Sequence, residues 1–188
     1  MIRAMAKAIV ACMEKHGTIY PAERDIYIYG CDTALYTAFS TLGLLALGAG
    51  FGRLWETVVC VSLFYLNQSF GGGYHADTHM RCFLTMAAGL VIFLLSFYLL
   101  PPQGIDILAG YLSLTALYAM PLVLHKNKEY LARHKEKLVR RSRRISLLQI
   151  AVFSLILIHP VSRIIHAYSA ALTLCMISRL TAVYRQSK

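Results

Sequence analysis

Six apolar segments follow one another along this 188-residue chain, and each approaches the length that crosses a lipid bilayer. A membrane-crossing helix needs about 20 consecutive, mainly apolar residues. The six segments are residues 33–50, 54–70, 82–100, 105–124, 145–159 and 161–183. Charged residues make up 15% of the chain, whereas soluble domains average about 25%. The sequence therefore predicts an all-α polytopic membrane protein with about six transmembrane helices in a single domain, 1–188, and excludes a soluble nucleic-acid-binding module.

Residues 1–30, before the first apolar segment, have a different pattern. Apolar side chains recur there at helical spacing, at Ile2, Met5, Ala6, Ile9, Val10 and Met13. This spacing predicts an N-terminal amphipathic helix. Two placements remain open: the helix lies on the membrane surface as an interfacial helix, or it packs on the cytoplasmic side of the domain.

The distribution of positive charge predicts the orientation in the membrane. All but two of the 19 Lys and Arg residues fall in four segments that six crossings place on one side, namely 1–30, 67–81, 125–144 and 179–188. Positively charged loops stay in the cytoplasm. We therefore expect both termini to be cytoplasmic, and we interpret His159 and His166, on the outer side, as interfacial residues.

Residues 125–144 are predicted to form a basic cytoplasmic loop, in which only Glu129 and Glu136 oppose a dense block of Lys and Arg. One interpretation is an anchor that sets topology and touches anionic lipid headgroups. The other is a docking surface for an acidic peptide. The candidate binding residues of that surface are Arg140, Arg141, Arg143 and Arg144.

Residues 67–82 connect two apolar segments at the cytoplasmic edge, and we interpret them as a catalytic loop. Residues 71–82 read Gly-Gly-Gly-Tyr-His-Ala-Asp-Thr-His-Met-Arg-Cys. Cys82 begins an apolar helix, whose N-terminal potential favours the thiolate, and Arg81 adds positive charge. His75 is a candidate base for that thiol. On one continuous helix the two residues would be about 10.5 Å apart along the axis, so residues 75–82 must fold back.

Two alternatives compete with a catalytic pair of His75 and Cys82. His79 lies three residues before Cys82 and faces it if the helix starts early. His75, His79 and Cys82, together with Asp77, also have the chemistry and spacing of metal ligands. The sequence contains no HExxH, so the usual zinc-protease base is missing. On chemistry alone, catalysis, a metal site and a purely structural segment all remain open.

The segment from Gly72 to Cys82, with six apolar segments around it and a basic loop after the fourth, resembles the AgrB family of bacterial accessory-gene-regulator membrane peptidases. Six residues separate the catalytic His and Cys of this family, and His75 and Cys82 match that spacing. Gly73 matches the glycine before the family's Tyr-His pair. Residues 121–125, with Asn127 and Lys128, also look like the family's exit from its fourth span.

The resemblance implies a cysteine endopeptidase of the bacterial cytoplasmic membrane, with Cys82 as the nucleophile, His75 as the base, and no cofactor or metal. Its substrate would be an AgrD-like propeptide with an amphipathic leader, a signal core and an acidic tail. Tail release would leave a thioester, and cyclisation would give a thiolactone or lactone for quorum sensing. The expected partners are the propeptide and the lipid bilayer but no nucleic acid, and a homodimer is left open.

The supporting residues are less defined. The family commonly has an arginine seven residues before the catalytic His, where this chain has Gln68. Backbone N–H groups of Gly71, Gly72 and Gly73, or those at the start of the third apolar segment, are candidate oxyanion donors. Asp77, Asn67 and Gln68 are candidates for orienting His75. Two other functions stay open: a metal-dependent membrane enzyme or metal carrier, and a non-catalytic partner in peptide export.

Overall fold

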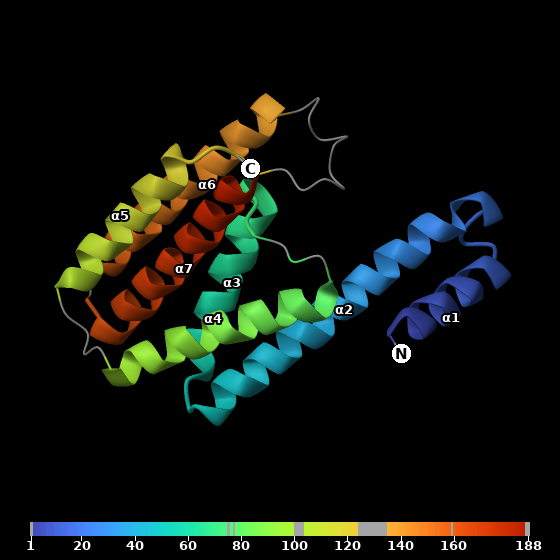
Figure 1. Ribbon diagram of the computed structural model, residues 1–188, viewed down its shortest axis with the longest axis horizontal. Coiled ribbons are helices and arrows are strands. Elements are labelled where there is room, and N and C mark those ends of the chain that lie inside the picture. Colours follow the sequence, from blue (N-terminus) through green and yellow to red (C-terminus); the bar gives the residue numbers. More distant parts are fainter. Residues whose placement is uncertain are drawn as a thin grey trace. The chain divides into compact units, whose positions relative to one another are not determined.

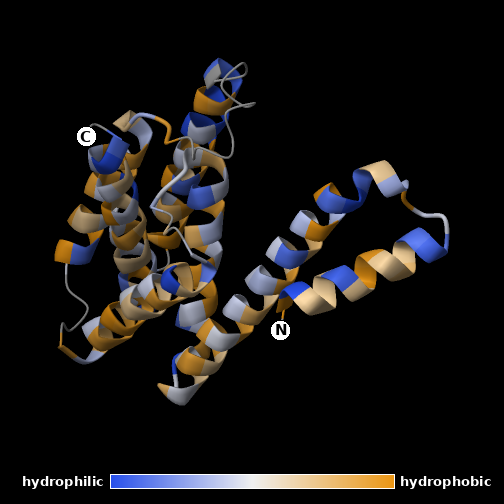
Figure 2. Cartoon of the chain, turned by 45° about the vertical axis from the view of Figure 1, so that its right-hand side comes forward, coloured by the Kyte–Doolittle hydropathy of each residue, from blue (hydrophilic) through white to orange (hydrophobic). Residues whose placement is uncertain are grey.

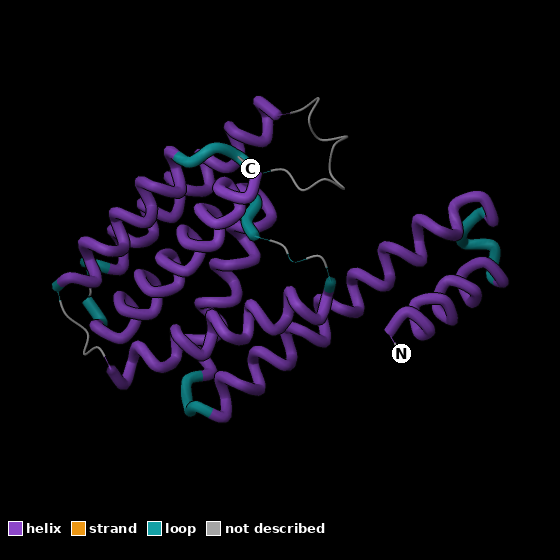
Figure 3. The backbone as a smooth tube through the Cα atoms, viewed as in Figure 1, coloured by secondary structure: helices purple, strands orange, loops and turns teal. Residues whose placement is uncertain are grey.

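The chain is all-α in the residues that the computed structural model describes, which are 2–74, 76, 78–99, 104–123, 135–158 and 160–186 (Figure 1). Figure 3 shows these helices in purple and the described loops and turns in teal. The α-helices are α1 (Ile2–Lys15), α2 (Arg24–Gly50), α3 (Leu54–Gly71), α4 (His79–Leu99), α5 (Ile105–Ala119), α6 (Lys135–Ile156) and α7 (Ser162–Gln186). Every apolar segment that the sequence singled out therefore coincides with a helix.

Residues 1–46 form one compact unit, which contains α1 and most of α2. The 3₁₀ helix η1 (Pro21–Glu23) precedes α2 directly, and the Arg24 guanidinium lies 3.6 Å from the Glu14 carboxylate. Figure 2 shows both apolar and polar residues around α1. Ala6 and Val10 are fully buried, whereas Met5 and Ile9 are exposed. The predicted amphipathic helix is thus present, and its placement on a membrane remains a prediction.

Residues 47–188 form a second compact unit, a bundle built around α7. Helix α7 packs most extensively against α5 and α3, and it also contacts α4 and α6. A Cβ atom at Gly110 of α5 would lie 2.6 Å from the Phe153 ring and 2.8 Å from Ser169 Oγ. Small residues at such a crossing let two helices approach closely without lipid between them. The Phe153 ring stacks on Tyr168 with ring centroids 5.4 Å apart, which fills the space beside Gly110.

Among the described residues, three stretches of helix are long and apolar enough to cross a membrane, namely Pro21–Gly50, His79–Leu99 and Ser162–Gln186. The apolar helix Ile105–Ala119 is shorter. Helices α3 and α6 occupy the second and fifth predicted spans. Helix α3 contains the polar residues Asn67, Gln68 and Ser69 close to its end, and the first turns of α6 are rich in Lys and Arg. Six crossings and cytoplasmic termini therefore remain predictions, whereas the all-α class and several membrane-length helices are confirmed.

Several predicted boundaries were wrong. Helix α2 begins at Arg24, within the predicted N-terminal segment 1–30 and before the predicted start of the first span at residue 33. Residues 135–144 were expected in a basic loop, but they form the first turns of α6; residues 124–134 lie outside the described residues. The fourth apolar segment was expected to continue to residue 124, but α5 ends at Ala119. Met120 is extended, with ψ 143°, because the following residue is Pro121, which disfavours helical backbone before it.

Candidate functional site

The connection from α3 to α4 is shorter than the predicted catalytic loop of 67–82. Residues 67–71 belong to α3 and residues 79–82 to α4. Between the two helices the structure describes residues 72–74, 76 and 78, none of which is helical. His75 and Asp77 lie outside the described residues, so the reach between a His75 base and Cys82 stays a prediction.

Gly72 ends α3 and turns the chain. Its φ of 71° is in the left-handed region that favours glycine, and its N–H donates to the carbonyl oxygen of Gln68 at 3.2 Å. Any Cβ at Gly72 would overlap the carbonyl oxygen of Val123. The Val123 N–H in turn donates to the carbonyl oxygen of Gly71 at 3.2 Å. The turn after α3 is therefore packed directly against the chain that leaves α5.

Tyr74, the residue bonded to His75, is held from both α3 and α7. Its N–H lies 3.2 Å from both the carbonyl oxygen and the hydroxyl of Ser178. Its carbonyl oxygen accepts a hydrogen bond of 3.4 Å from Gln68 Nε2. The Arg185 guanidinium lies over its ring, 4.8 Å from the centroid. Three independent contacts thus fix the backbone and side chain that precede the candidate base.

Arg179 is a buried cation within the sixth apolar segment, and sequence reasoning did not assign it a role. It is 3% exposed. Its Nε donates to the carbonyl oxygen of Pro121 at 3.2 Å, and its terminal nitrogens donate to those of Leu117 (3.0 Å) and Met120 (3.3 Å). Ser142 Oγ of α6 accepts from both terminal nitrogens. The guanidinium thereby satisfies carbonyls that the end of α5 leaves without helical partners, where a cation is also favoured by the helix dipole.

Cys82 lies in the first turn of α4, which Thr78 caps. The Thr78 hydroxyl accepts a hydrogen bond from the Arg81 N–H at 3.3 Å, and the Thr78 carbonyl accepts one from the Cys82 N–H at 3.0 Å. Cys82 is partly exposed, and His79 and Arg81 are exposed. The thiol is thus close to the positive end of a helix dipole and accessible to a reactant.

The structure separates the other predicted site residues into two groups. Gly71, Gly72, Gly73 and Gln68 gather at the end of α3, whereas Cys82 and its neighbours begin α4. In the described part of the chain, no hydrogen bond joins these two groups. Of the three glycines proposed as oxyanion donors, Gly72 already uses its N–H. The described residues offer no partner for the N–H of Gly73, so it remains the candidate donor.

Of the two amides considered for orienting His75, Gln68 is the better placed. Asn67 is buried, and its Nδ2 donates to the carbonyl oxygen of Leu63 on its own helix. Gln68 lies against Gly73, where a Cβ atom would be 2.8 Å from its Oε1. That Oε1 atom is buried and has no hydrogen-bond partner among the described residues.

The structure gives a partial view of the metal-site hypothesis. Outside the gaps in the description, no three His, Cys, Asp or Glu side chains gather closely enough to hold a metal ion. His75 and Asp77, which the hypothesis needs together with His79 and Cys82, fall within those gaps.

The four arginines predicted to bind an acidic tail lie on α6. Arg140, Arg141, Arg143 and Arg144 are all exposed, whereas Ser142 between them is buried. These four residues therefore present a cationic helical surface rather than part of an irregular loop.

A second polar cluster lies at the opposite ends of the same helices and was missed by sequence reasoning. His166 was interpreted as interfacial, but it is 3% exposed. Its Nδ1 lies 3.1 Å from Asp106 Oδ1, and its Nε2 lies 3.0 Å from Ser96 Oγ. The Ser96 hydroxyl donates its one proton to the carbonyl oxygen of Phe93 at 2.6 Å. Ser96 is therefore an acceptor from His166, and the cluster ties α4, α5 and α7 together instead of activating a serine nucleophile. His159 lies outside the described residues.

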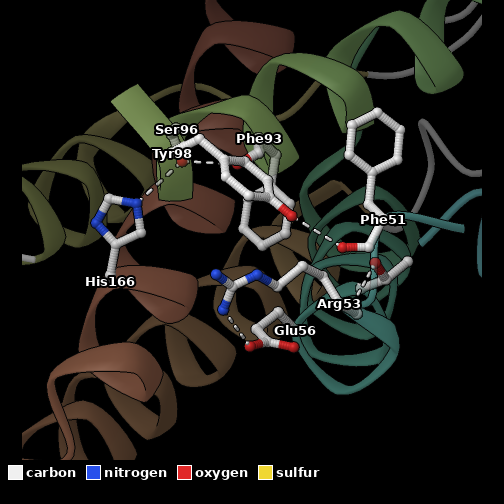
Figure 4. Close-up of polar contacts among 8 residues, drawn as sticks. Phe51, Arg53, Glu56, Phe93, Ser96, Tyr98 and His166 are labelled. Atoms are coloured by element: carbon white, nitrogen blue, oxygen red, sulfur yellow. Dashed lines mark hydrogen bonds and ion pairs between the residues drawn. The ribbon is translucent and has the colours of Figure 1, made fainter. Parts of the chain in front are cut away.

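Figure 4 shows a further ion pair close to His166. Arg53 Nη1 lies 3.2 Å from Glu56 Oε1, and the Arg53 guanidinium lies over the Phe97 ring, 5.0 Å from its centroid. The Tyr98 hydroxyl donates to the carbonyl oxygen of Phe51 at 3.0 Å. The only sequence signal for these contacts was the presence of charged residues within or beside apolar segments.

We compared the sequence with models of known protein families, with curated proteins and with solved structures. The family model described as AgrB: Accessory gene regulator B matches residues 6–181, which is nearly the full length. Comparisons with curated proteins and with solved structures give no match.

Proposed function

This chain belongs to the AgrB family, and from that premise we propose that it is a membrane cysteine endopeptidase in which Cys82 is the nucleophile and His75 the general base. Membership of the family implies processing of an AgrD autoinducer propeptide. The observation that carries the residue assignment is the position of Cys82. It lies in the first turn of a capped helix, seven residues after His75 in the sequence.

The proposed reaction begins with transfer of the Cys82 thiol proton to His75. The thiolate attacks the carbonyl carbon at the end of the signal core, and the carbonyl oxygen becomes an oxyanion, for which the Gly73 N–H is the candidate donor. Collapse of this intermediate breaks the peptide bond. His75 returns its proton to the leaving amine, and the tail departs. The leader and core remain bound to Cys82 as a thioester.

Ring closure follows when a Cys or Ser side chain within the core attacks that thioester. The new bond forms a thiolactone or lactone, and the Cys82 sulfur leaves as a thiolate. Water competes with the internal nucleophile and would give a linear acid. A site at the edge of an apolar helical bundle favours the ring, because it limits water and holds the internal nucleophile close to the thioester.

We expect alkylation of Cys82 to stop tail release. The test uses the full-length protein in liposomes with an acidic-tailed propeptide, and mass spectrometry locates iodoacetamide adducts. Loss of activity follows modification of Cys82, while modification of the exposed Cys12 leaves activity unchanged. A metal chelator has no effect. Full activity after complete modification of Cys82, or loss of activity in chelator alone, contradicts a thiol peptidase.

The exposed arginines of α6 are proposed to bind the acidic tail. Replacing Arg140, Arg141, Arg143 and Arg144 with Gln is expected to raise KM by about tenfold, because each exposed ion pair contributes roughly 0.2–1 kcal/mol. Higher salt should weaken wild-type binding in the same direction. The matched control replaces the same four residues with Lys, which retains the charge. An unchanged KM and salt response in the Gln variant would leave these residues only the role of a topology anchor.

The remaining proposals concern placement in the cell. We propose six membrane crossings with both termini in the cytoplasm, from the charge distribution of the loops. The site and the α6 arginines then lie on the cytoplasmic side of a bacterial membrane, where an unprocessed propeptide is available. The sequence leaves homodimerisation open.

A further inference from the structure

Two consecutive residues of α7 hold two segments that are distant in the sequence. Ser178 contacts the Tyr74 N–H through both its backbone carbonyl oxygen and its hydroxyl, each at 3.2 Å. Arg179 binds the end of α5 through the carbonyl oxygens of residues 117, 120 and 121. A hydrogen bond from Val123 to Gly71 joins the first segment to the second. We call Ser178, Arg179 and the backbone that they contact the α7 junction.

The segments of the α7 junction approach each other so closely that two of its glycines leave no room for a side chain. A Cβ atom at Gly71 would lie 2.6 Å from Arg179 Nη1 and 3.3 Å from Ser142 Oγ. A Cβ atom at Gly73 would lie 2.8 Å from the Gln68 side chain, which also approaches the Ser178 hydroxyl at 3.5 Å. Gly71 therefore allows the end of α3 to approach Arg179 of α7, and Gly73 allows the chain to pass close to the Gln68 side chain.

We propose that Ser178 and Arg179 are positioning residues for the catalytic pair, and that they act by fixing the backbone up to the residue bonded to His75. This inference rests on the proposed function. Ser178 anchors Tyr74 directly. Arg179 anchors the end of α5, whose exit backbone bonds to Gly71, and so keeps the glycine turn in place. Displacement of a catalytic group by about 1 Å is enough to slow a reaction about a hundredfold.

The contacts of Arg179 exclude a direct role in binding the substrate. A guanidinium has five N–H groups, and the structure shows five hydrogen bonds from it, all to the protein. The side chain is also 3% exposed. A substrate carboxylate could not bind Arg179 without breaking the cap on α5. Its effect on catalysis therefore passes through the geometry of the glycine turn.

The experiment compares Ser178→Ala and Arg179→Lys with the wild-type protein in liposomes. We expect kcat for tail release to fall about tenfold in Ser178→Ala and more in Arg179→Lys, with KM within about threefold. The second readout is the pH profile of Cys82 alkylation, measured by mass spectrometry. A positioned base sustains the thiolate at low pH, so the ratio of the rate at pH 6 to that at pH 9 is expected to fall about tenfold.

Matched variants separate positioning from a general loss of structure. Ser178→Thr retains the hydroxyl and is expected to restore kcat and the pH profile to within about threefold of wild type. Ser69→Ala and Arg163→Lys change exposed residues of α3 and α7 and serve as controls. Thermal unfolding of each variant is followed in parallel. Should Arg179→Lys fail to fold, Ser178→Ala still tests the proposal. This variant is expected to fold, because the hydrogen bond from the Tyr74 N–H to the backbone carbonyl oxygen of residue 178 remains.

Two results overturn the inference: a folded Ser178→Ala variant with wild-type kcat and pH profile, or a lower melting temperature with no change in that profile. The variant His75→Ala distinguishes these results from a failure of the proposed function. If His75→Ala leaves Cys82 alkylation and tail release unchanged, the catalytic pair is wrong. If His75→Ala changes both readouts and Ser178→Ala changes neither, the catalytic pair stands and the positioning role is wrong.

Discussion

Replacing either Cys82 or His75 with alanine is expected to lower the rate of tail release by about 10⁴-fold or more. In the proposed mechanism, Cys82→Ala removes the atom that would form the acyl-enzyme bond. His75→Ala removes the group proposed to accept the thiol proton and to return it to the leaving amine. The measurement is tail release from an AgrD-like propeptide by full-length protein in liposomes.

The matched control for the base is His79→Ala. His79 is exposed in the first turn of α4, three residues before Cys82, and is the competing candidate. We expect this variant to retain activity within about threefold, and all three variants to appear in the membrane fraction at wild-type levels. An inactive His79→Ala variant together with an active His75→Ala variant would assign the base to His79.

A propeptide that lacks its internal nucleophile is expected to trap the acyl-enzyme. Changing the core Cys or Ser to Ala leaves the first step intact, because tail release needs only the scissile carbonyl and the catalytic pair. The second step then has no attacking group apart from water. If the site excludes water, the tail is released in about one equivalent per active site, followed by slow turnover.

The trapped species has a defined composition and reactivity. The mass of the protein rises by that of the leader and core, and the fragment maps to Cys82. Hydroxylamine releases the fragment, since thioesters react with strong nucleophiles and amides do not. The unmodified propeptide is the control, and it gives a cyclic product with many turnovers. Rapid turnover of the altered propeptide to a linear acid would show free access of water and contradict the cyclase mechanism.

Much of the fold followed from local sequence patterns. Each predicted apolar segment coincides with a helix, and the spacing of apolar residues before residue 16 predicted α1. Hydropathy and helical periodicity depend on neighbouring residues, so they are visible without a tertiary structure. The ends were less accurate: α6 begins at Lys135 because a Lys- and Arg-rich sequence has good helix propensity, even though its charge suggested a loop.

The candidate site was only partly accessible to sequence reasoning. The end of the second apolar segment at residue 70 and the start of the third at residue 82 lie close to the observed end of α3 and start of α4. The roles of Ser178 and Arg179 were missed, because their partners in residues 74 and 117–121 are far away in the sequence. The pairing of His75 with Cys82 stays a prediction.

The sequence by itself determined the all-α class of the protein and the order of its helices, because hydropathy and the spacing of apolar residues are local properties. Only the tertiary structure decided which polar side chains inside apolar helices find partners. Arg179 caps α5, and His166 pairs with Asp106, through contacts between helices. A buried polar group is costly unless it is hydrogen-bonded, and whether a partner is available depends on how the helices pack.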